Sequence, residues 1–270
     1  MFPEGTVPES LLNDATIGIS HYAVSFAVDV RPSGSATLVK LNDEFGFLTA
    51  AHVVDDIMRS DSPTVEVILS SRLHRVSIEK RFLRIVRFGP TDAELPGPDI
   101  AFLGLHDPMR IAALKAIKSF YPLTDQAAEV YEKIPQKFTA YCVVAGMPAE
   151  MASETGRRHA ADHVWKMTLF FGRTQIIEEI AEGDFSYLRC AMWAGTNSFP
   201  SNYGGVSGGG IWHIPFLMEE SNGVTKVSDL KPELVGVAFY QSGVEDQSRT
   251  LIAHSYRGLY RVLSEKRKSV

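Results

Sequence analysis

Short apolar runs separated by polar turns occupy the chain between His21 and Leu105. The runs are HYAVSFAVDV, ATLVKL, GFLTAAHVV, TVEVILS, HRVSIEK, LRIVRFG and DIAFLGL, and turn segments such as RPSGS and NDEF stand between them. Runs rich in β-branched and aromatic residues with such punctuation are typical of antiparallel strands. We therefore expect this half of the chain to form an antiparallel sheet, with His52 in the strand-like run that ends at Val54.

After this first group of runs, the spacing of apolar residues changes from that of a strand to that of a helix. Asp107 and Pro108 form a favourable N-cap and first-turn pair ahead of MRIAALKAIKSF, whose apolar positions recur at helical spacing. The second half then returns to strand-like runs, in KFTAYCVVAGMP, HVWKMTLFFGRTQII, FSYLRCAMWAG, GGIWHIP and ELVGVAFYQS. The final stretch, AHSYRGLYRVLSEKRKS, has the pattern of a terminal helix.

The order of these elements predicts an all-β protein with a single domain over residues 1–270. Two antiparallel barrels with a cleft between them satisfy the order of strands, connector, strands and helix. The expected boundaries are about 20–106 for the first barrel, 107–135 for a connector with its helix, 136–252 for the second barrel and 253–268 for a C-terminal helix.

Composition and charge narrow the class of protein. The 270 residues are 45% hydrophobic, which is enough for a globular core, and the net charge of −5 speaks against a nucleic-acid surface. Residues 1–18 lack a basic start followed by an apolar run, and no stretch is long and apolar enough to span a bilayer, so we expect a cytoplasmic protein without membrane contact. Cys142 and Cys190 lie in strand-like runs, which favours buried free thiols over a disulfide.

Five glycines surround one serine in SNYGGVSGGGIW, which places Ser207 where backbone N–H groups can approach a ligand closely. A tight turn that needs glycine torsions is the competing explanation. A serine nucleophile needs a base such as His52 and a carboxylate such as Asp99 that orients the imidazole. The N–H groups of Gly205 and Ser207 could then stabilise an oxyanion.

Other acidic residues compete with Asp99 for the orienting role. Asp55 and Asp56 are too close to His52 along the chain to reach around its imidazole easily. Asp92 lies in a polar loop with no apolar strand after it, and it remains the alternative.

GFLTAAHV, DIAFLGL, GGVSGGGIW and LVGVAFYQS, in this order, resemble the chymotrypsin/trypsin-like serine peptidases, especially the compact bacterial members. The similarity covers roughly residues 21–262. It implies two six-stranded barrels of the chymotrypsin type, with His52 as general base, Asp99 as its orienting carboxylate and Ser207 as nucleophile in the cleft between them. It also implies that Gly205 and Ser207 form the oxyanion hole.

The chain departs from this family at the residue before the serine. Val206 stands where the digestive members carry an aspartate that binds a newly cut N-terminus. Activation by cleavage of a zymogen is therefore not expected in that form. We expect some other contact to hold or switch the oxyanion loop, which makes a latent protease with a regulatory protein partner one hypothesis.

Substrate specificity also departs from that of trypsin. Phe239, Tyr240 and Gln241 stand where the family has a Ser-Trp-Gly edge, which argues against a wide, trypsin-like slot. Ser201, at the position of the pocket floor, supplies no carboxylate for an arginine or lysine side chain. Family members that prefer acidic or amide side chains use a histidine from the second barrel, for which His213 and His254 are the candidates. The expected substrate residues are thus Ser201, Phe239, Tyr240, Gln241 and His254.

These observations predict a serine endopeptidase that acts on polypeptides and requires no metal or organic cofactor. Two alternatives stay open. The first is a catalytically silent, protease-like binding domain. The second is an α/β-hydrolase esterase, because Gly205-Val206-Ser207-Gly208-Gly209 also fits a nucleophile elbow, although the residues that follow favour a strand over the helix which that elbow must open.

Overall fold

Strands dominate the computed structural model, which describes residues 9–29, 31–69, 75–88, 98–123, 139–157, 163–166, 168–183, 185–195, 199–221, 224–229, 231–243, 248–255, 257 and 259. The helices are α1 (Glu9–Ser20), α2 (Ala51–Arg59) and α3 (Pro108–Lys115), with 3-10 turns η1 (Lys80–Phe82) and η2 (Ala149–Met151). The first group of strands is β1 (Ala23–Val28), β2 (Arg31–Leu41), β3 (Glu44–Thr49), β4 (Thr64–Ile68), β5 (Arg75–Glu79), β6 (Leu83–Arg87), β7 (Ala101–Leu105) and β8 (Tyr121–Leu123). The second group is β9 (Thr139–Gly146), β10 (Ser153–Arg157), β11 (His163–Lys166), β12 (Phe170–Glu182), β13 (Phe185–Trp193), β14 (Gly210–Ser221), β15 (Val224–Asp229), β16 (Glu233–Gln241) and β17 (Ser248–Ser255).

The first group forms a curled sheet rather than a closed barrel. Its strand order is β5-β4-β1-β2-β3-β7-β6, with β8 parallel to β2. The two edge strands, β5 and β6, are joined directly by η1, yet the described residues contain no ladder between them. Of the two closed barrels expected, the described residues show this one only as a curled half-barrel, because no backbone ladder joins its edge strands there.

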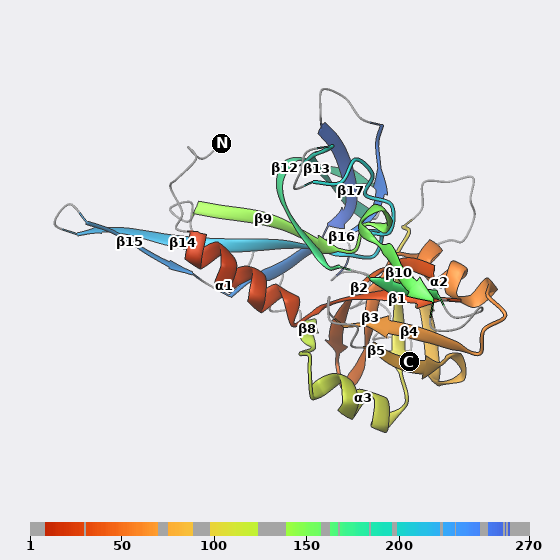
Figure 1. Cartoon of the computed structure of the whole chain (residues 1–270). Helices are drawn as coiled ribbons and strands as arrows, with labels where there is room; N and C mark the ends of the chain where they lie inside the picture. The colour runs from red at the N-terminus through yellow and green to blue at the C-terminus, as the bar shows by residue number, and fades with distance from the viewer. Residues whose placement is uncertain are drawn as a thin grey trace.

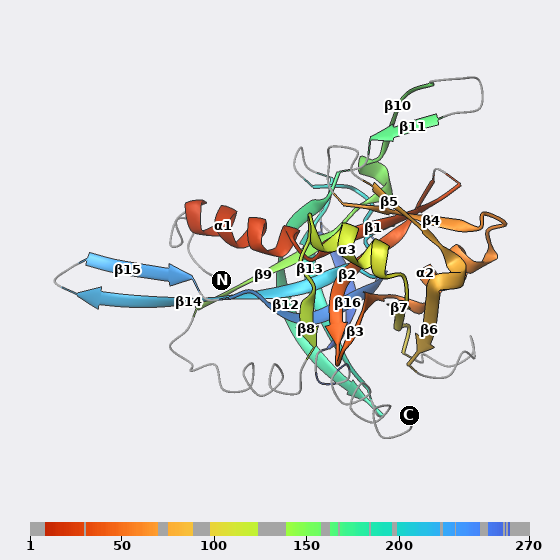
Figure 2. The ribbon, with the colours of Figure 1, turned by 90° about the horizontal axis from the view of Figure 1, so that it is seen from below.

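The second group closes into a six-stranded barrel in the order β9-β12-β13-β17-β16-β14, and β14 pairs back onto β9. The closing ladder runs from Gly210 opposite Ala145 to Phe216 opposite Thr139. Beyond the barrel, β14 and β15 extend as a long hairpin, which Figures 1 and 2 show projecting from the body. The predicted all-β class is confirmed, and a closed barrel beside a half-barrel is compatible with a chymotrypsin-like fold.

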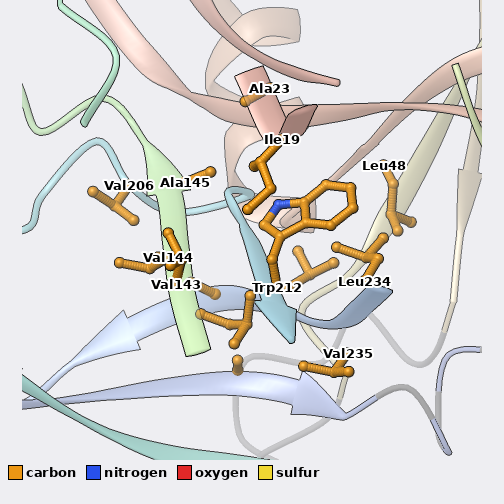
Figure 3. Close-up of a cluster of buried hydrophobic side chains, with 14 of the residues drawn as sticks. Ile19, Ala23, Leu48, Val143, Val144, Ala145, Val206, Trp212, Leu234 and Val235 are labelled. Carbon is orange, nitrogen blue, oxygen red and sulfur yellow. The ribbon is translucent and has the colours of Figure 1, made fainter. Parts of the chain in front are cut away.

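A shared hydrophobic core holds the half-barrel against the barrel. Trp212 of β14 is fully buried, and Figure 3 shows its indole among Ile19 of α1, Leu48 of β3 and Leu234 of β16. The Tyr22 ring stacks on Trp212 with 5.4 Å between ring centroids, and the Tyr121 ring meets it edge-on at 5.2 Å. Burial of apolar surface and the contacts between these rings stabilise the junction.

A local capping signal accounts for α3, whereas packing decides that α2 is a helix. As predicted, Asp107 caps α3 by accepting hydrogen bonds from the N–H groups of Met109 and Arg110, and Pro108 occupies the first turn. The expectation of a strand through His52 is wrong, because β3 ends at Thr49 and α2 begins at Ala51. The buried side chains of α2, namely Val53, Val54 and Ile57, lie on one helical face, and this packing outweighs the β propensity of the valines.

The two ends of the chain differ from the sequence-based expectation. Helix α1 was not predicted; it buries Ala15 and Ile19. The expected helix over 253–268 does not begin where predicted, because residues 253–255 belong to β17 and pair with β13 and β16. Most of that segment lies outside the described residues. Among the described helices, none is both long and apolar enough to cross a membrane.

Candidate active site

His52 and Asp99 form a close pair at the N-terminus of α2. The Asp99 carboxylate accepts a hydrogen bond from the backbone N–H of His52 at 2.9 Å, and its second oxygen contacts Nδ1 of the His52 ring. One carboxylate therefore holds both the backbone and the ring of the same residue. The N–H groups of the first helical turn have no partner within the helix, so a carboxylate is stabilised at this position.

The pair shifts the ionisation of both groups in opposite directions. The hydrogen bond to Asp99 raises the pKa of His52, against the opposing effect of partial burial. Burial disfavours the charged form of Asp99, but the hydrogen bond and charge of His52 outweigh it, so the pKa of Asp99 lies below its usual value. Because Nδ1 faces the carboxylate, Nε2 is the ring nitrogen that can accept a proton in the neutral imidazole.

The rival carboxylates have other partners or lie outside the described residues. Asp55 pairs with Arg87, and Asp56 pairs with Arg59 at 2.7 Å. The negative charges of both carboxylates raise the pKa of His52, but each does so less than Asp99. Asp92 lies outside the described residues. Of the described acids, Asp99 alone is hydrogen bonded to the imidazole of His52.

The loop before β14 carries Ser207 close to the strand that leads to His52. The carbonyl of Ser207 accepts a hydrogen bond from Ser35 N at 2.8 Å. Gly208 has φ +86, and a Cβ on it would lie 2.1 Å from Oγ1 of Thr49, three residues before His52. At Gly208 the turn explanation holds, because the left-handed torsion requires glycine, and the close approach to β3 leaves no room for a side chain.

Two backbone donors in this loop stay free. In the described part of the chain, no hydrogen bond uses the N–H of Gly205 or of Ser207 as its donor. The carbonyl of Gly204 accepts from Ala149 N at 2.6 Å. The carbonyl and the N–H of one peptide unit point in opposite directions, so this bond turns the Gly205 N–H away from Ala149. Two unpaired donors beside a serine are what an oxyanion needs.

The Ser207 hydroxyl itself has one weak partner. Its Oγ lies 3.4 Å from the carbonyl oxygen of Phe239, which is long for an O–H donor. Within the described residues, no hydrogen bond joins Oγ to the His52 ring. The structure thus brings Ser207 and the His52–Asp99 pair to the same junction, with the serine hydroxyl turned toward β16.

A pocket of about 350 Å³ opens beside Ser207. Its lining consists of uncharged residues, namely Tyr203, Gly204, Val206, Ser207, Ala238, Phe239, Tyr240, Gln241 and Leu251. The Gln241 amide is already engaged, because Oε1 accepts from Tyr203 N at 2.8 Å and Nε2 donates to Asn202 Oδ1 at 2.6 Å. The pocket therefore offers an uncharged space in which the Gln241 amide is already hydrogen bonded.

Two residues expected to bind substrate lie outside this lining. Ser201 is exposed. Its hydroxyl donates to the Glu150 carboxylate at 2.7 Å, and its carbonyl accepts from Arg249 at 2.6 Å. His254 is 2% exposed and stacks on Phe239 with 4.4 Å between ring centroids. Burial lowers the pKa of His254 to about 4. His254 thus packs beneath the pocket wall as a neutral ring.

His213 and the cysteines also lie away from the pocket. His213 is on β14, opposite Cys142 of β9, and burial lowers the pKa of its imidazole to about 4. Cys142 and Cys190 are both free, as expected, and burial raises the pKa of each thiol to about 12. Neither thiol is suited to nucleophilic chemistry near neutral pH.

Residues outside the loop 199–209, which we call the serine loop, form hydrogen bonds to it, and the sequence did not single them out. Ser35 of β2 contacts Gly205 and Ser207, and Ala149 contacts Gly204. Ser35 lies 172 positions before Ser207 in a run that looked like an ordinary turn and strand start. No local pattern could have connected the two.

Comparison of the chain with models of known protein families, and with curated proteins, finds no match.

Proposed function

We propose that the protein is a serine endopeptidase that forms an acyl-enzyme on Ser207. One observation carries the proposal: His52 and Asp99 form a hydrogen-bonded pair just after β3, and the loop that packs against Thr49 of β3 carries a serine that lines a pocket beside two N–H donors unused in the described residues. The order of His52, Asp99 and Ser207 along the chain supports it as well. These are the parts that serine acyl transfer needs: base, orienting acid, nucleophile and oxyanion donors.

In this mechanism the Ser207 oxygen attacks the scissile carbonyl while Nε2 of His52 takes the hydroxyl proton. Asp99 stabilises the imidazolium that forms, consistent with the raised pKa of His52. The N–H groups of Gly205 and Ser207 receive the negative charge of the carbonyl oxygen. His52 then returns the proton to the leaving amine and activates a water that hydrolyses the acyl-enzyme.

The reaction requires the Ser207 side chain to turn from Phe239 toward His52. The contact with the Phe239 carbonyl is long, so its loss costs little free energy. Side-chain rotation at one serine is also fast compared with catalysis. Catalytic hydrogen bonds often tighten only when substrate is bound, so the geometry without substrate is compatible with the proposal.

The pocket favours a neutral side chain on the acyl side of the cleaved bond. Its nine lining residues carry no charge, so an arginine, lysine, aspartate or glutamate would lose its hydration without gaining an ion pair. Phe239, Tyr240 and Leu251 supply apolar contact instead. A peptide library is therefore expected to show cleavage after apolar residues, whereas dominant cleavage after arginine or lysine would contradict the proposed specificity.

The decisive experiment is intact-mass spectrometry after treatment with a fluorophosphonate probe. We expect one adduct on the isolated wild-type protein and none on Ser207→Ala. His52→Ala should lose the adduct too, because the hydroxyl is a poor nucleophile without its base. Ser201→Ala is the matched control, since its hydroxyl lies in the same loop but is bound to Glu150, and it should label normally.

Other outcomes separate the alternatives. Failure of the folded wild type to label favours a silent binding domain, an alternative supported by the orientation of the Ser207 hydroxyl toward Phe239. Labelling only after a protein partner is added would indicate the latent protease. Cleavage of esters without cleavage of peptides would favour an esterase, although Ser207 precedes the strand β14 rather than the helix of a nucleophile elbow.

A further inference from the structure

Ser35 lies where the half-barrel, the end of β9 and the serine loop meet. It belongs to β2 and is fully buried. Its hydroxyl donates to the carbonyl of Gly205 at 2.7 Å and accepts from the N–H of Met147 at 2.8 Å. Its backbone N–H donates to the carbonyl of Ser207 at 2.8 Å. One residue of the first sheet therefore holds the carbonyls of the same two residues whose N–H groups are free.

The position of the Ser35 hydroxyl is itself constrained. The carbonyl of Ser35 accepts from Oγ1 of Thr49 at 2.7 Å, which ties β2 to the end of β3 just before His52. A Cβ on Gly146 would lie 3.1 Å from the Ser35 oxygen, so β9 passes close beside it. The hydroxyl donates its one proton to Gly205 and accepts from Met147, so it is hydrogen bonded both as donor and as acceptor.

The peptide that joins Gly205 to Val206 lies between the two peptides that carry the free donors. Its carbonyl is bound by Ser35, and its N–H donates to the carbonyl of Tyr203 at 3.0 Å. Without the hydroxyl, this partly buried carbonyl loses its partner and the peptide is free to rotate toward another donor. Rotation there would redirect the neighbouring N–H groups of Gly205 and Ser207.

We infer that Ser35 is a positioning residue that keeps the two N–H donors beside Ser207 aligned for the oxyanion. The inference rests on the proposed function and deepens it, because it makes the half-barrel responsible for the geometry of a loop that belongs to the closed barrel. Ser35 touches no reacting atom; it acts through the backbone of Gly205 and Ser207.

The test compares Ser35→Ala with Thr174→Val. Thr174 of β12 is the matched control, because it is buried and its hydroxyl donates to a backbone carbonyl, that of Ala191 at 2.9 Å, outside the serine loop. We expect Ser35→Ala to lower kcat and the rate of fluorophosphonate labelling by about 10- to 100-fold, with KM within about threefold, because the donors act mainly on the transition state. Thr174→Val should change each rate by no more than about twofold.

Hydrogen–deuterium exchange of residues 203–209 tests the clamp without relying on activity. Ser35→Ala should speed exchange in this loop, and Thr174→Val should not. Unchanged exchange together with unchanged kcat would overturn the inference, as would equal losses of kcat in both variants. A wild type that never labels would overturn the proposed function instead, and exchange would still decide whether Ser35 holds the loop.

Ser35→Cys is a second variant that tests the inference even where the alanine variant does not fold. It keeps a side chain of similar shape, but its thiol is a weak donor and acceptor. We expect kcat to fall between those of wild type and Ser35→Ala, with faster exchange in the loop. Wild-type kcat and wild-type exchange in this variant would show that the hydroxyl is not needed.

Discussion

The half-barrel and the closed barrel contribute to the candidate site in different ways. The half-barrel supplies side-chain chemistry, because His52 and Asp99 form a hydrogen-bonded pair at the start of α2. The closed barrel supplies backbone geometry, because glycines and main-chain hydrogen bonds shape the loop around Ser207. Substitutions of His52 or Asp99 should therefore change protonation at the site, whereas substitutions in the loop around Ser207, or of Ser35 that holds it, should change the shape of the loop.

Removal of the proposed base should have the largest effect on rate. His52→Ala is expected to lower kcat by about 10⁵-fold, since the Ser207 hydroxyl then has no proton acceptor. The His52 side chain is 43% exposed, so the melting temperature should change little. Steady-state kinetics on a peptide with a neutral residue before the scissile bond, together with thermal unfolding, checks both parts. Retention of a tenth of wild-type kcat would contradict a role for His52 as base.

Asp99→Asn should lower kcat by about 10⁴-fold, because an amide cannot stabilise the imidazolium. It should also change the pH profile. The pKa of His52 is raised above 6.5 by Asp99, and activity needs the neutral ring, so wild-type kcat/KM should rise with pH through a midpoint above 6.5.

In Asp99→Asn that midpoint should move to lower pH. Asp55→Asn is the control, because Asp55 pairs with Arg87 and acts on His52 only from a distance. Its midpoint should stay near that of wild type. An equal shift in the two variants would show that overall charge, and not the hydrogen bond, sets the pKa of His52.

Substitution of Gly208 tests backbone geometry without touching a titratable group. A Cβ there would lie 2.0 Å from the carbonyl oxygen of Ser35, and φ is +86. Gly208→Ala should destabilise the protein and lower kcat by about 10²- to 10³-fold, comparable to the loss of one oxyanion donor. Gly183→Ala is the control, because Gly183 also has positive φ, at +55, but has open space around its Cα.

Gly183→Ala should cost only about 1 kcal/mol of stability from the left-handed torsion and leave kcat unchanged. Chemical unfolding measures the loss of stability in each variant, and steady-state kinetics measures the loss of kcat. Equal kcat for both alanine variants would mean that the close approach between Gly208 and Ser35 does not matter for the reaction.

The two halves should also differ in how their histidines affect stability in acid. Burial lowers the pKa of His254 in the barrel from 6.5 to about 4. Between these values the unfolded chain binds a proton that the folded chain does not, so stability should fall as pH falls from 6.5 to 4, by about 3 kcal/mol for this residue.

His52 has the opposite sign, because its raised pKa stabilises the folded state below pH 6.5 and this gain is lost as pH rises through the folded value. When the free energy of unfolding in urea is plotted against pH, the curve should be flatter for His254→Leu than for wild type between pH 4 and 6.5. Parallel curves would show that His254 is protonated in the folded protein.

Strand-like runs, the Asp107–Pro108 cap and the order of His52, Asp99 and Ser207 could be recognised from sequence, because each depends on residues that are neighbours in the chain or on chemical type. Helix α2 was missed because its valines favour strands, and only packing of Val53, Val54 and Ile57 decides for a helix. The same limit applies to His254, which looked suited to a pocket but is buried beneath it.

The sequence by itself determined the all-β class and the types of residue available for chemistry, since strand periodicity and side-chain identity are local properties. Only the tertiary structure decided that β14 pairs with β9 to close one barrel while β5 and β6 leave the other sheet open. It also decided that Ser35 contacts Gly205 and Ser207. Strand pairing and buried hydrogen bonds between segments far apart in the chain depend on how whole sheets curl and pack, and no local pattern encodes that outcome.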